Sequence, residues 1–414
     1  MPNLPETDPR STPTPESLRA ALVDTLVRDF ATLKMPLSPE VVDAFGAVPR
    51  HLFLPDVAPE RAYAYDAVVT KRAENGSAMS SVSAPQIIAM MLMLLDLKPG
   101  HRVLEIGSGG YNALLMRELV GPDGEVTTID IDADVTDRAK RGLTAAGVTD
   151  VNVLTGDGGL GAPEFAPFDR IVVTVGAPDI AAPWDDQLAE DGRIVLPLDL
   201  RGLTRAVAFE REAGHLSSRG YGVCGFVPMQ GVGAHAKRLI LLHDQDVALR
   251  VDDDMAVDAE PLRKALLEPR VERWTGVTVG AMEPFDQLDL WLASVASGFC
   301  LLTADREAVD RGLVTPSWRL GTPALVDGDS FAYRARARPV DPEETVYEFG
   351  VYGHGPAADT VAETLAEHIR TWDREHRSGP GARIEAYPVD TADADLPAGR
   401  VIDKRNTRVT ISWP

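Results

Sequence analysis

The sequence has few cysteines and no long apolar run. Its 414 residues include only Cys224 and Cys300, too few and too widely separated for a disulfide framework or a thiolate metal site. The longest apolar stretch, from Ile87 to Leu97, is about half of what a bilayer span requires. These absences predict a protein of the reducing cytoplasm without a transmembrane helix.

The N-terminal segment lacks the marks of a signal peptide. Residues 1–17 alternate proline with serine and threonine and have neither a basic start nor an apolar core. We expect this segment to be a disordered tail that directs no export.

Basic residues are outnumbered. The chain has 41 Lys and Arg residues against 63 Asp and Glu residues, a formal net charge of −22. Such a charge repels phosphate backbones and anionic membranes, which disfavours nucleic acid or lipid as the main partner. A peptide or a small molecule is the expected partner, and the oligomeric state stays open.

The length and composition favour two domains, since 414 residues exceed one usual core and 44% of them are hydrophobic. The pattern predicts a first domain over residues 18–245, an acidic linker over 246–258 and a second domain of mixed helices and strands over 259–414.

What the sequence does contain is a nucleoside-binding pattern. Val103 to Ile106 forms an apolar strand that carries an acid at Glu105, and the glycines 107, 109 and 110 follow. A second strand ends at Asp130, where a carboxylate can bind ribose hydroxyls. A dinucleotide fingerprint would need a third glycine where Asn112 stands, so the pattern favours S-adenosylmethionine.

Strands and helices alternate after this motif. We expect helices over 85–97, 111–120 and 135–146, strands over 102–106, 125–130, 151–155 and 168–175, and then strand-like segments over 193–198, 205–210, 222–227 and 238–243. The fold class is therefore α/β, with a mostly parallel sheet covered by helices on both faces and finished by antiparallel strands. In the second domain we expect a helix over 357–377 and strands over 331–337, 345–352 and 409–413.

The sequence offers no convincing catalytic base or metal site. A carboxylate nucleophile needs neither, because it is already ionised at neutral pH. The histidines are scattered, and His51, His215 and His235 are expected to be structural or surface residues.

Six segments resemble, in order, the signatures of the protein-L-isoaspartate O-methyltransferase family. They are residues 48–51, 81–85, 103–107, 156–158, 168–174 and 226–229. Residues 107–113, residues 224–231 and the long C-terminal extension resemble more narrowly the branch associated with lanthipeptides. The resemblance implies a class I, Rossmann-like methyltransferase that esterifies an aspartate of a precursor peptide, after which the next backbone amide attacks the ester to give an aspartimide or an isoaspartate.

The same resemblance assigns residues to the site. Ser83 corresponds to the hydroxyl that orients the acceptor carboxylate. The cofactor contacts correspond to Glu105, Gly107, Ser108, Gly109, Asp130, Ile131, Asp157 and Gly158. Ser83 has a second reading, since Ser83 and Gln86 also fit a capping box at the start of a helix.

Two departures from the family pattern concern cofactor geometry and acceptor choice. The glycine-rich loop is one residue shorter than usual, and Gln86 replaces a common histidine. The sequence is thus compatible with three functions: methylation of a dedicated precursor peptide, general isoaspartate repair, and cofactor binding without catalysis.

Overall fold

The computed structural model describes residues 13–74, 76–107, 109–235 and 237–414. The chain divides into two compact units. Unit 1 comprises residues up to 198 together with 205–213 and 218–234, and unit 2 comprises 199–204, 214–217 and 235–414. The last boundary between the units lies between residues 234 and 235, which is earlier in the chain than the boundary expected near residue 245.

Unit 1 begins with helices. These are α1 (Pro15–Thr32), α2 (Pro39–Ala47), the 3-10 turn η1 (Arg50–Phe53) and α3 (Pro59–Ala62). Helix α1 starts inside the expected disordered tail, because the Thr14 side chain accepts a hydrogen bond from the Ser17 amide and Pro15 suits the first helical position. The prediction of disorder is thus wrong for residues 15–17, and residues 1–12 lie outside the described residues.

The sheet of unit 1 has the order β9-β8-β7-β6-β3-β4-β5. Its strands are β3 (Arg102–Ile106), β4 (Glu125–Asp130), β5 (Val151–Thr155), β6 (Phe168–Val173), β7 (Leu188–Leu200), β8 (Leu203–Glu212) and β9 (His215–Val223). Strands β3 to β7 pair in parallel. Two-residue connections join β7 to β8 and β8 to β9, and such short loops only connect antiparallel neighbours. The predicted antiparallel finish is confirmed.

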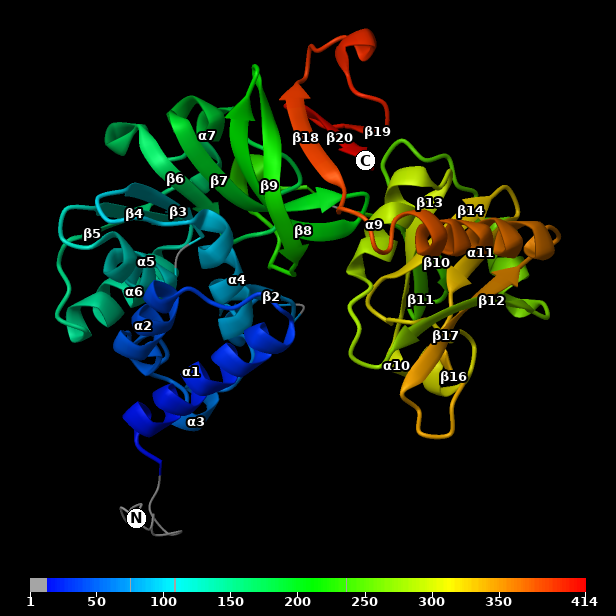
Figure 1. Ribbon diagram of the computed structural model, residues 1–414, viewed down its shortest axis with the longest axis horizontal. Coiled ribbons are helices and arrows are strands. Elements are labelled where there is room, and N and C mark those ends of the chain that lie inside the picture. Colours follow the sequence, from blue (N-terminus) through cyan, green and yellow to red (C-terminus); the bar gives the residue numbers. More distant parts are fainter. Residues whose placement is uncertain (1–12, 75, 108, 236) are drawn as a thin grey trace. The chain divides into compact units, whose positions relative to one another are not determined.

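Helices cover both faces of this sheet. In Figure 1, α4 (Pro85–Leu95), α5 (Tyr111–Val120) and α6 (Ala133–Ala145) lie on one side, and α7 (Ala182–Gln187) lies on the other. The short turns η2 (Gly158–Leu160), η3 (Pro163–Phe165) and η4 (Gly231–Gly233) complete the connections. The strand order reverses between β3 and β6, and ligands of open α/β sheets bind at such a switch point.

A separate hairpin accompanies this sheet. Strands β1 (Val68–Arg72) and β2 (Ala78–Val82) pair only with each other in the described part of the chain. The sequence pattern predicts neither strand, because their side chains are mostly half-buried and their apolar residues do not alternate clearly.

Unit 2 contains an antiparallel sheet of order β10-β11-β13-β14-β15-β17-β12. The strands are β10 (Arg238–His243), β11 (Val247–Val251), β12 (Val271–Gly280), β13 (Phe299–Ala304), β14 (Thr322–Asp327), β15 (Ser330–Arg334), β16 (Arg338–Pro339) and β17 (Val346–His354). Strand β11 lies within the expected acidic linker. Its Val247, Leu249 and Val251 are buried and its neighbours β10 and β13 satisfy its backbone, so this stretch is not a linker.

Successive residues of β13 face two different cores of unit 2. Leu301 packs with α9 (Asp286–Val295) and α11 (Ala358–Glu375), whereas Cys300 and Leu302 pack with α8 (Ala259–Leu267) and α10 (Arg306–Asp310). The prediction of a helix over 357–377 is confirmed.

The C-terminal strands belong to unit 2. Strand β20 (Thr407–Ser412) lies between β18 (Arg383–Pro388) and β19 (Arg400–Asp403), and a turn η5 (Asp393–Asp395) precedes β19. The Trp413 indole donates a hydrogen bond to Ser294 Oγ at 2.8 Å and packs edge-on against Trp291. The prediction of a strand near 409–413 is confirmed.

The described chain has neither a membrane-spanning helix nor a disulfide bond. Across the described residues, no helix is both long and apolar enough to cross a bilayer. Both cysteines are free and buried, Cys224 in unit 1 and Cys300 in unit 2.

Candidate active site

Two adjoining pockets lie at the switch point of the unit 1 sheet. The first, called the serine pocket, spans about 620 Å³, part of which is open to solvent, and includes Ser80, Ser81 and Ser83 in its wall. The second, called the aspartate pocket, encloses about 470 Å³ and includes Asp130 and Asp132. They share the lining residues Met79, Ser80, Gly107, Asp130 and Val175, so they form one continuous cleft.

The aspartate pocket is formed largely by chain turns at the ends of parallel strands. Strand β3 ends at Ile106, directly before Gly107, and β4 ends at Asp130. The Asp130 carboxylate accepts a hydrogen bond from the Asp132 amide at 2.9 Å. Ile131 is 42% exposed and lines the pocket together with Gly158. An exposed apolar side chain beside a fixed carboxylate suits a ligand with a flat ring and a sugar.

Glycine at position 107 is required by the fold itself. Its φ is 92°, and a Cβ there would come within 2.8 Å of Thr174 Oγ1 and 2.9 Å of Val175 Cγ1. The Thr174 hydroxyl donates to the carbonyl oxygens of Ile106 and Gly107. This contact ties the end of β6 to the end of β3.

At position 109, the surrounding protein does not require glycine. A Cβ at Gly109 would meet only Val82 Cγ2, at 3.8 Å, and the residue lines the serine pocket. Because the surrounding protein leaves room for a side chain, the open space at Gly109 is available to a ligand.

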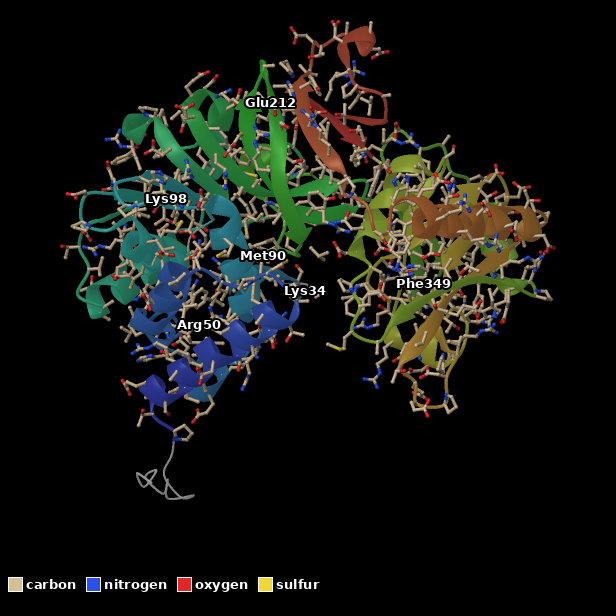
Figure 2. All side chains as sticks on the ribbon, viewed as in Figure 1. Lys34, Arg50, Met90, Lys98, Glu212 and Phe349 are labelled. Atoms are coloured by element: carbon tan, nitrogen blue, oxygen red, sulfur yellow. The ribbon has the colours of Figure 1, made fainter. Side chains whose placement is uncertain are left out.

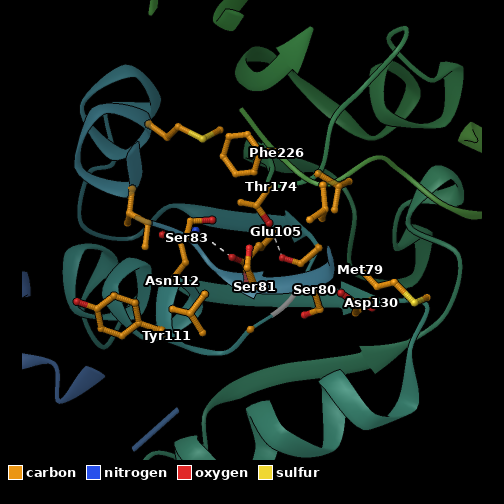
Figure 3. A pocket seen from close by; sticks show the side chains of 17 residues that line it. Met79, Ser80, Ser81, Ser83, Glu105, Tyr111, Asn112, Asp130, Thr174 and Phe226 are labelled. Carbon is orange, nitrogen blue, oxygen red and sulfur yellow. Dashed lines mark hydrogen bonds between the residues drawn. The ribbon is translucent and has the colours of Figure 1, made fainter. Parts of the chain in front are cut away.

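Glu105 is a buried acid in the wall of the serine pocket. Its Oε1 accepts from Asn112 Nδ2 at 2.9 Å (Figure 3). Its Oε2 accepts from the Thr128 hydroxyl at 2.5 Å. Burial raises the pKa of Glu105 to about 7, although both hydrogen bonds favour the ionised form. A nearby cation of a ligand would therefore stabilise its charge.

Ser83 lines the serine pocket but does not cap helix α4. The N-cap of α4 is Ala84, and no side chain bonds to the end of this helix. The capping-box explanation of Ser83 is therefore wrong. The hydroxyl lies in a pocket whose apolar residues are Met79, Val82, Ile88, Met91, Val175, Phe226 and Val227.

Asp157 lines neither pocket. Its carboxylate accepts hydrogen bonds from the amides of Gly159 at 2.9 Å and Val232 at 2.8 Å. In this way it fixes the turn η4 beside η2. A role of Asp157 near an adenine stays a prediction, and Ser108 lies outside the described residues.

The β1–β2 hairpin closes one side of the cleft. Met79 and Ser80 line both pockets, and Lys71 forms ion pairs with Asp132 and, at 3.1 Å, with Asp134. The hydrogen bond with Asp132 raises the pKa of Lys71, and the same bond lowers the pKa of Asp132. The hairpin is thus held to the strand end that carries Asp130.

The histidines lie outside these pockets. His51 Nδ1 is 2.9 Å from the Tyr63 hydroxyl, His215 is paired with Glu385, and His235 is 3.3 Å from Asp253. No group of three or more His, Cys, Asp or Glu residues suited to a metal ion occurs among the residues that the structure describes.

The sequence matches one protein family. The profile described as "Protein-L-isoaspartate(D-aspartate) O-methyltransferase" matches residues 21–233. The chain belongs to this family.

Curated relatives agree with this membership. The protein-L-isoaspartate O-methyltransferase of Methanopyrus kandleri is 39% identical over 211 residues, which cover 50% of this chain and 91% of the relative. The enzyme of that name from Hyperthermus butylicus is 40% identical over 223 residues, 51% of this chain and 88% of the relative.

Two solved structures of methyltransferases are similar to parts of this chain. A protein-L-isoaspartate O-methyltransferase is 21% identical with a TM-score of 0.49 and covers 89% of this chain and 96% of its own. A beta-aspartate methyltransferase from Plasmodium falciparum in complex with S-adenosyl-L-homocysteine is 18% identical with a TM-score of 0.43, and covers 50% and 97%.

Family membership fixes the enzyme class. Unit 1 has the class I methyltransferase fold, and the chain is an S-adenosylmethionine-dependent carboxyl O-methyltransferase. Residues 234–414 lie outside the matched range.

Sequence reasoning missed several residues of the cleft. Met79 and Ser80 come from the unpredicted hairpin, whereas Ser81, Phe226 and Val227 belong to the family-like segments but were assigned no role in the site. Asn112 was noted only as a missing glycine. The available signal was its position seven residues after Glu105, which places the two side chains together across the turn into α5.

Proposed function

We propose that this enzyme methylates the side-chain carboxylate of an aspartate in one dedicated, ribosomally made precursor peptide of the lanthipeptide type. The observation that carries the proposal is unit 2. It has hydrophobic cores of its own and lies almost entirely beyond residues 21–233, which the family model matches. A second folded unit supplies further surface, which could recognise a particular partner peptide.

The cleft residues fit the donor. Asp130 would accept hydrogen bonds from the ribose, Ile131 and Gly158 would contact the adenine, and Glu105 would attract the cationic methionine end. The open space at Gly109 supports this assignment, because a side chain there would enter the pocket and not the protein. When bound, the donor supplies a methyl group that is already activated by its sulfonium.

The acceptor would lie at Ser83. Its hydroxyl would orient the aspartate carboxylate, and the apolar residues around it would exclude water. The carboxylate forms a bond to the methyl carbon as the carbon–sulfur bond breaks, so no proton is removed and no base is needed. This fits a cleft that no histidine lines among its described residues.

The ester would then react within the peptide. Attack by the next backbone amide nitrogen on the ester carbonyl closes a ring and releases methanol, which gives the aspartimide. Addition of water opens this ring to aspartate or isoaspartate. The reaction would take place in the reducing cytoplasm, an environment in which two free thiols are expected.

General protein repair is the second candidate, favoured by the names of the relatives. The test uses two synthetic versions of a lanthipeptide-type precursor peptide, one with aspartate and one with isoaspartate at the acceptor position. Mass spectrometry would follow the gain of a methyl group and the loss of water. We expect the aspartate version to be the better substrate, and preference for isoaspartyl peptides would contradict the proposal.

A cofactor-binding module without catalysis is the third candidate. It predicts donor binding and no turnover of either peptide version. The intact set of Ser83, Glu105 and Asp130 in one cleft argues against it.

A further inference from the structure

A buried arginine lies behind the wall of the serine pocket. Arg50, the first residue of η1, is 0% exposed (labelled in Figure 2). Its Nε donates to the Ala62 carbonyl at 2.7 Å, and its Nη2 donates to the carbonyls of Val82 at 3.3 Å and Ser83 at 2.9 Å. Its guanidinium carbon lies 4.9 Å from the centre of the Tyr111 ring.

Arg50 has no acidic partner within the described residues. It forms no salt bridge there, and its buried Nη1 has no hydrogen-bond partner. The charged or titratable groups that act on it are Tyr63, Tyr111 and Arg61. Burial lowers the pKa of Arg50, but a guanidinium stays protonated in proteins. A buried cation without a counterion is costly, and stability alone gives no reason to keep one.

The serine pocket needs a positive charge that its own lining lacks. Glu105 and Asp130 line it, whereas no Lys, Arg or His does so among the described residues. An enzyme that binds an acceptor carboxylate in such a pocket must overcome the repulsion from these acids. Val82, Ser83 and Tyr111, which Arg50 contacts, all line this pocket.

We propose that Arg50 is a positioning residue that holds the backbone at Ser83 and supplies the counter-charge for the acceptor carboxylate. The cation acts across a single layer of residues in a water-poor wall, where charges interact strongly. It therefore selects an anionic acceptor over a neutral one. This inference rests on the proposed placement of the acceptor at Ser83.

The alternative is that Arg50 only ties three chain segments together. Both roles predict lower stability when Arg50 is replaced, so stability does not distinguish them. Selectivity between an acid and its amide does, because a structural tie has no reason to favour a charged ligand.

The experiment compares Arg50→Met and Arg50→Lys with the wild type. Calorimetry in the presence of S-adenosylhomocysteine measures the affinity for two peptides that differ only in a carboxylate or an amide at the acceptor position. The peptide is whichever of the aspartate or isoaspartate versions is the better substrate, so failure of the precursor-peptide proposal does not decide this test.

We expect Arg50→Met to reduce the preference for the acid by about tenfold and to leave the affinity for S-adenosylhomocysteine unchanged. Arg50→Lys should keep the preference for the acid, because the positive charge is retained. It should lower kcat, because an ammonium lacks the planar set of donors with which the guanidinium holds the backbone at Ser83. An unchanged preference in Arg50→Met would overturn the proposal. If Arg50→Met does not fold, loss of the preference in Arg50→Lys would overturn it.

Ser83→Ala separates this inference from the placement on which it rests. It should lower kcat/KM for the same peptide about tenfold without changing the affinity for S-adenosylhomocysteine. Unchanged kcat/KM would reject the acceptor site at Ser83, whatever Arg50 does.

Discussion

The two pockets of the cleft differ in how they are made. The aspartate pocket is formed mainly where β3, β4 and their following turns come together, with glycines at the points of closest approach. The serine pocket depends on side chains from β2, α4, α5 and the segment around Phe226. The first is fixed by local chain geometry and suits a constant donor. The second is assembled from distant segments and is free to differ with the acceptor.

The largest expected effect concerns Asp130. We predict that Asp130→Ala weakens S-adenosylmethionine binding by tenfold or more, since a hydrogen bond to a charged group is worth about 1.5–3 kcal/mol. Calorimetry measures the affinity, and thermal unfolding checks the fold. Asp137→Ala is the matched control, because Asp137 is exposed on α6 and lines neither pocket. Equal affinities in the two variants would remove Asp130 from the donor site.

Substitutions at two glycines of the cleft should distinguish an effect on donor binding from an effect on folding. Gly109→Ala should lower donor affinity about tenfold and leave the melting temperature unchanged, because the new methyl group enters the pocket. Gly107→Ala should instead destabilise the fold by about 1–3 kcal/mol, because its φ is positive and its Cβ would clash. A lower melting temperature in Gly109→Ala would show that this glycine serves the fold.

Glu105 should make both stability and donor affinity depend on pH. Its pKa of about 7 lies above the ordinary value of 4.5, so between these values the folded protein binds more protons than the unfolded chain. The free energy of unfolding therefore falls as pH rises through this interval and is level above it.

Donor affinity should change in the opposite direction. A cationic ligand favours the ionised carboxylate, so affinity should rise between about pH 6 and pH 8 by at most about tenfold per unit below the pKa. Calorimetry across this range should give a flat profile for Glu105→Gln. A flat profile for the wild type would place the donor's cationic end away from Glu105.

The smallest expected effect concerns the hairpin. Lys71→Met removes the ion pairs with Asp132 and Asp134, which are partly exposed. We expect S-adenosylhomocysteine to dissociate about two to five times faster, since exposed ion pairs contribute little. Stopped-flow displacement measures this rate, with Arg72→Met on the same hairpin as the control. Equal rates in both variants would exclude a holding role for Lys71.

The sequence predicted the parts of the fold that rest on local pattern. The alternation of strands and helices from Arg102 to Val173 is confirmed, because each strand is a short run that contains several apolar residues. The turn after β3 was found for the same reason.

Parts that depend on distant contacts were not predicted. The charged residues around β11 hid a strand whose alternate residues are buried, because acidic neighbours dominate the composition there. The hairpin residues of the cleft gave no periodic signal. Arg50 was quoted only as part of a motif, since its burial without an acid is a property of the folded chain.

The free thiols have a practical consequence. Burial raises the pKa of Cys224 to about 12 and that of Cys300 still further, so neither reacts readily while the chain stays closed. Because one lies in each unit, alkylation followed by peptide mapping reports separately how often each unit opens. The enzyme thus carries an internal probe of whether a bound peptide steadies one half, the other, or both.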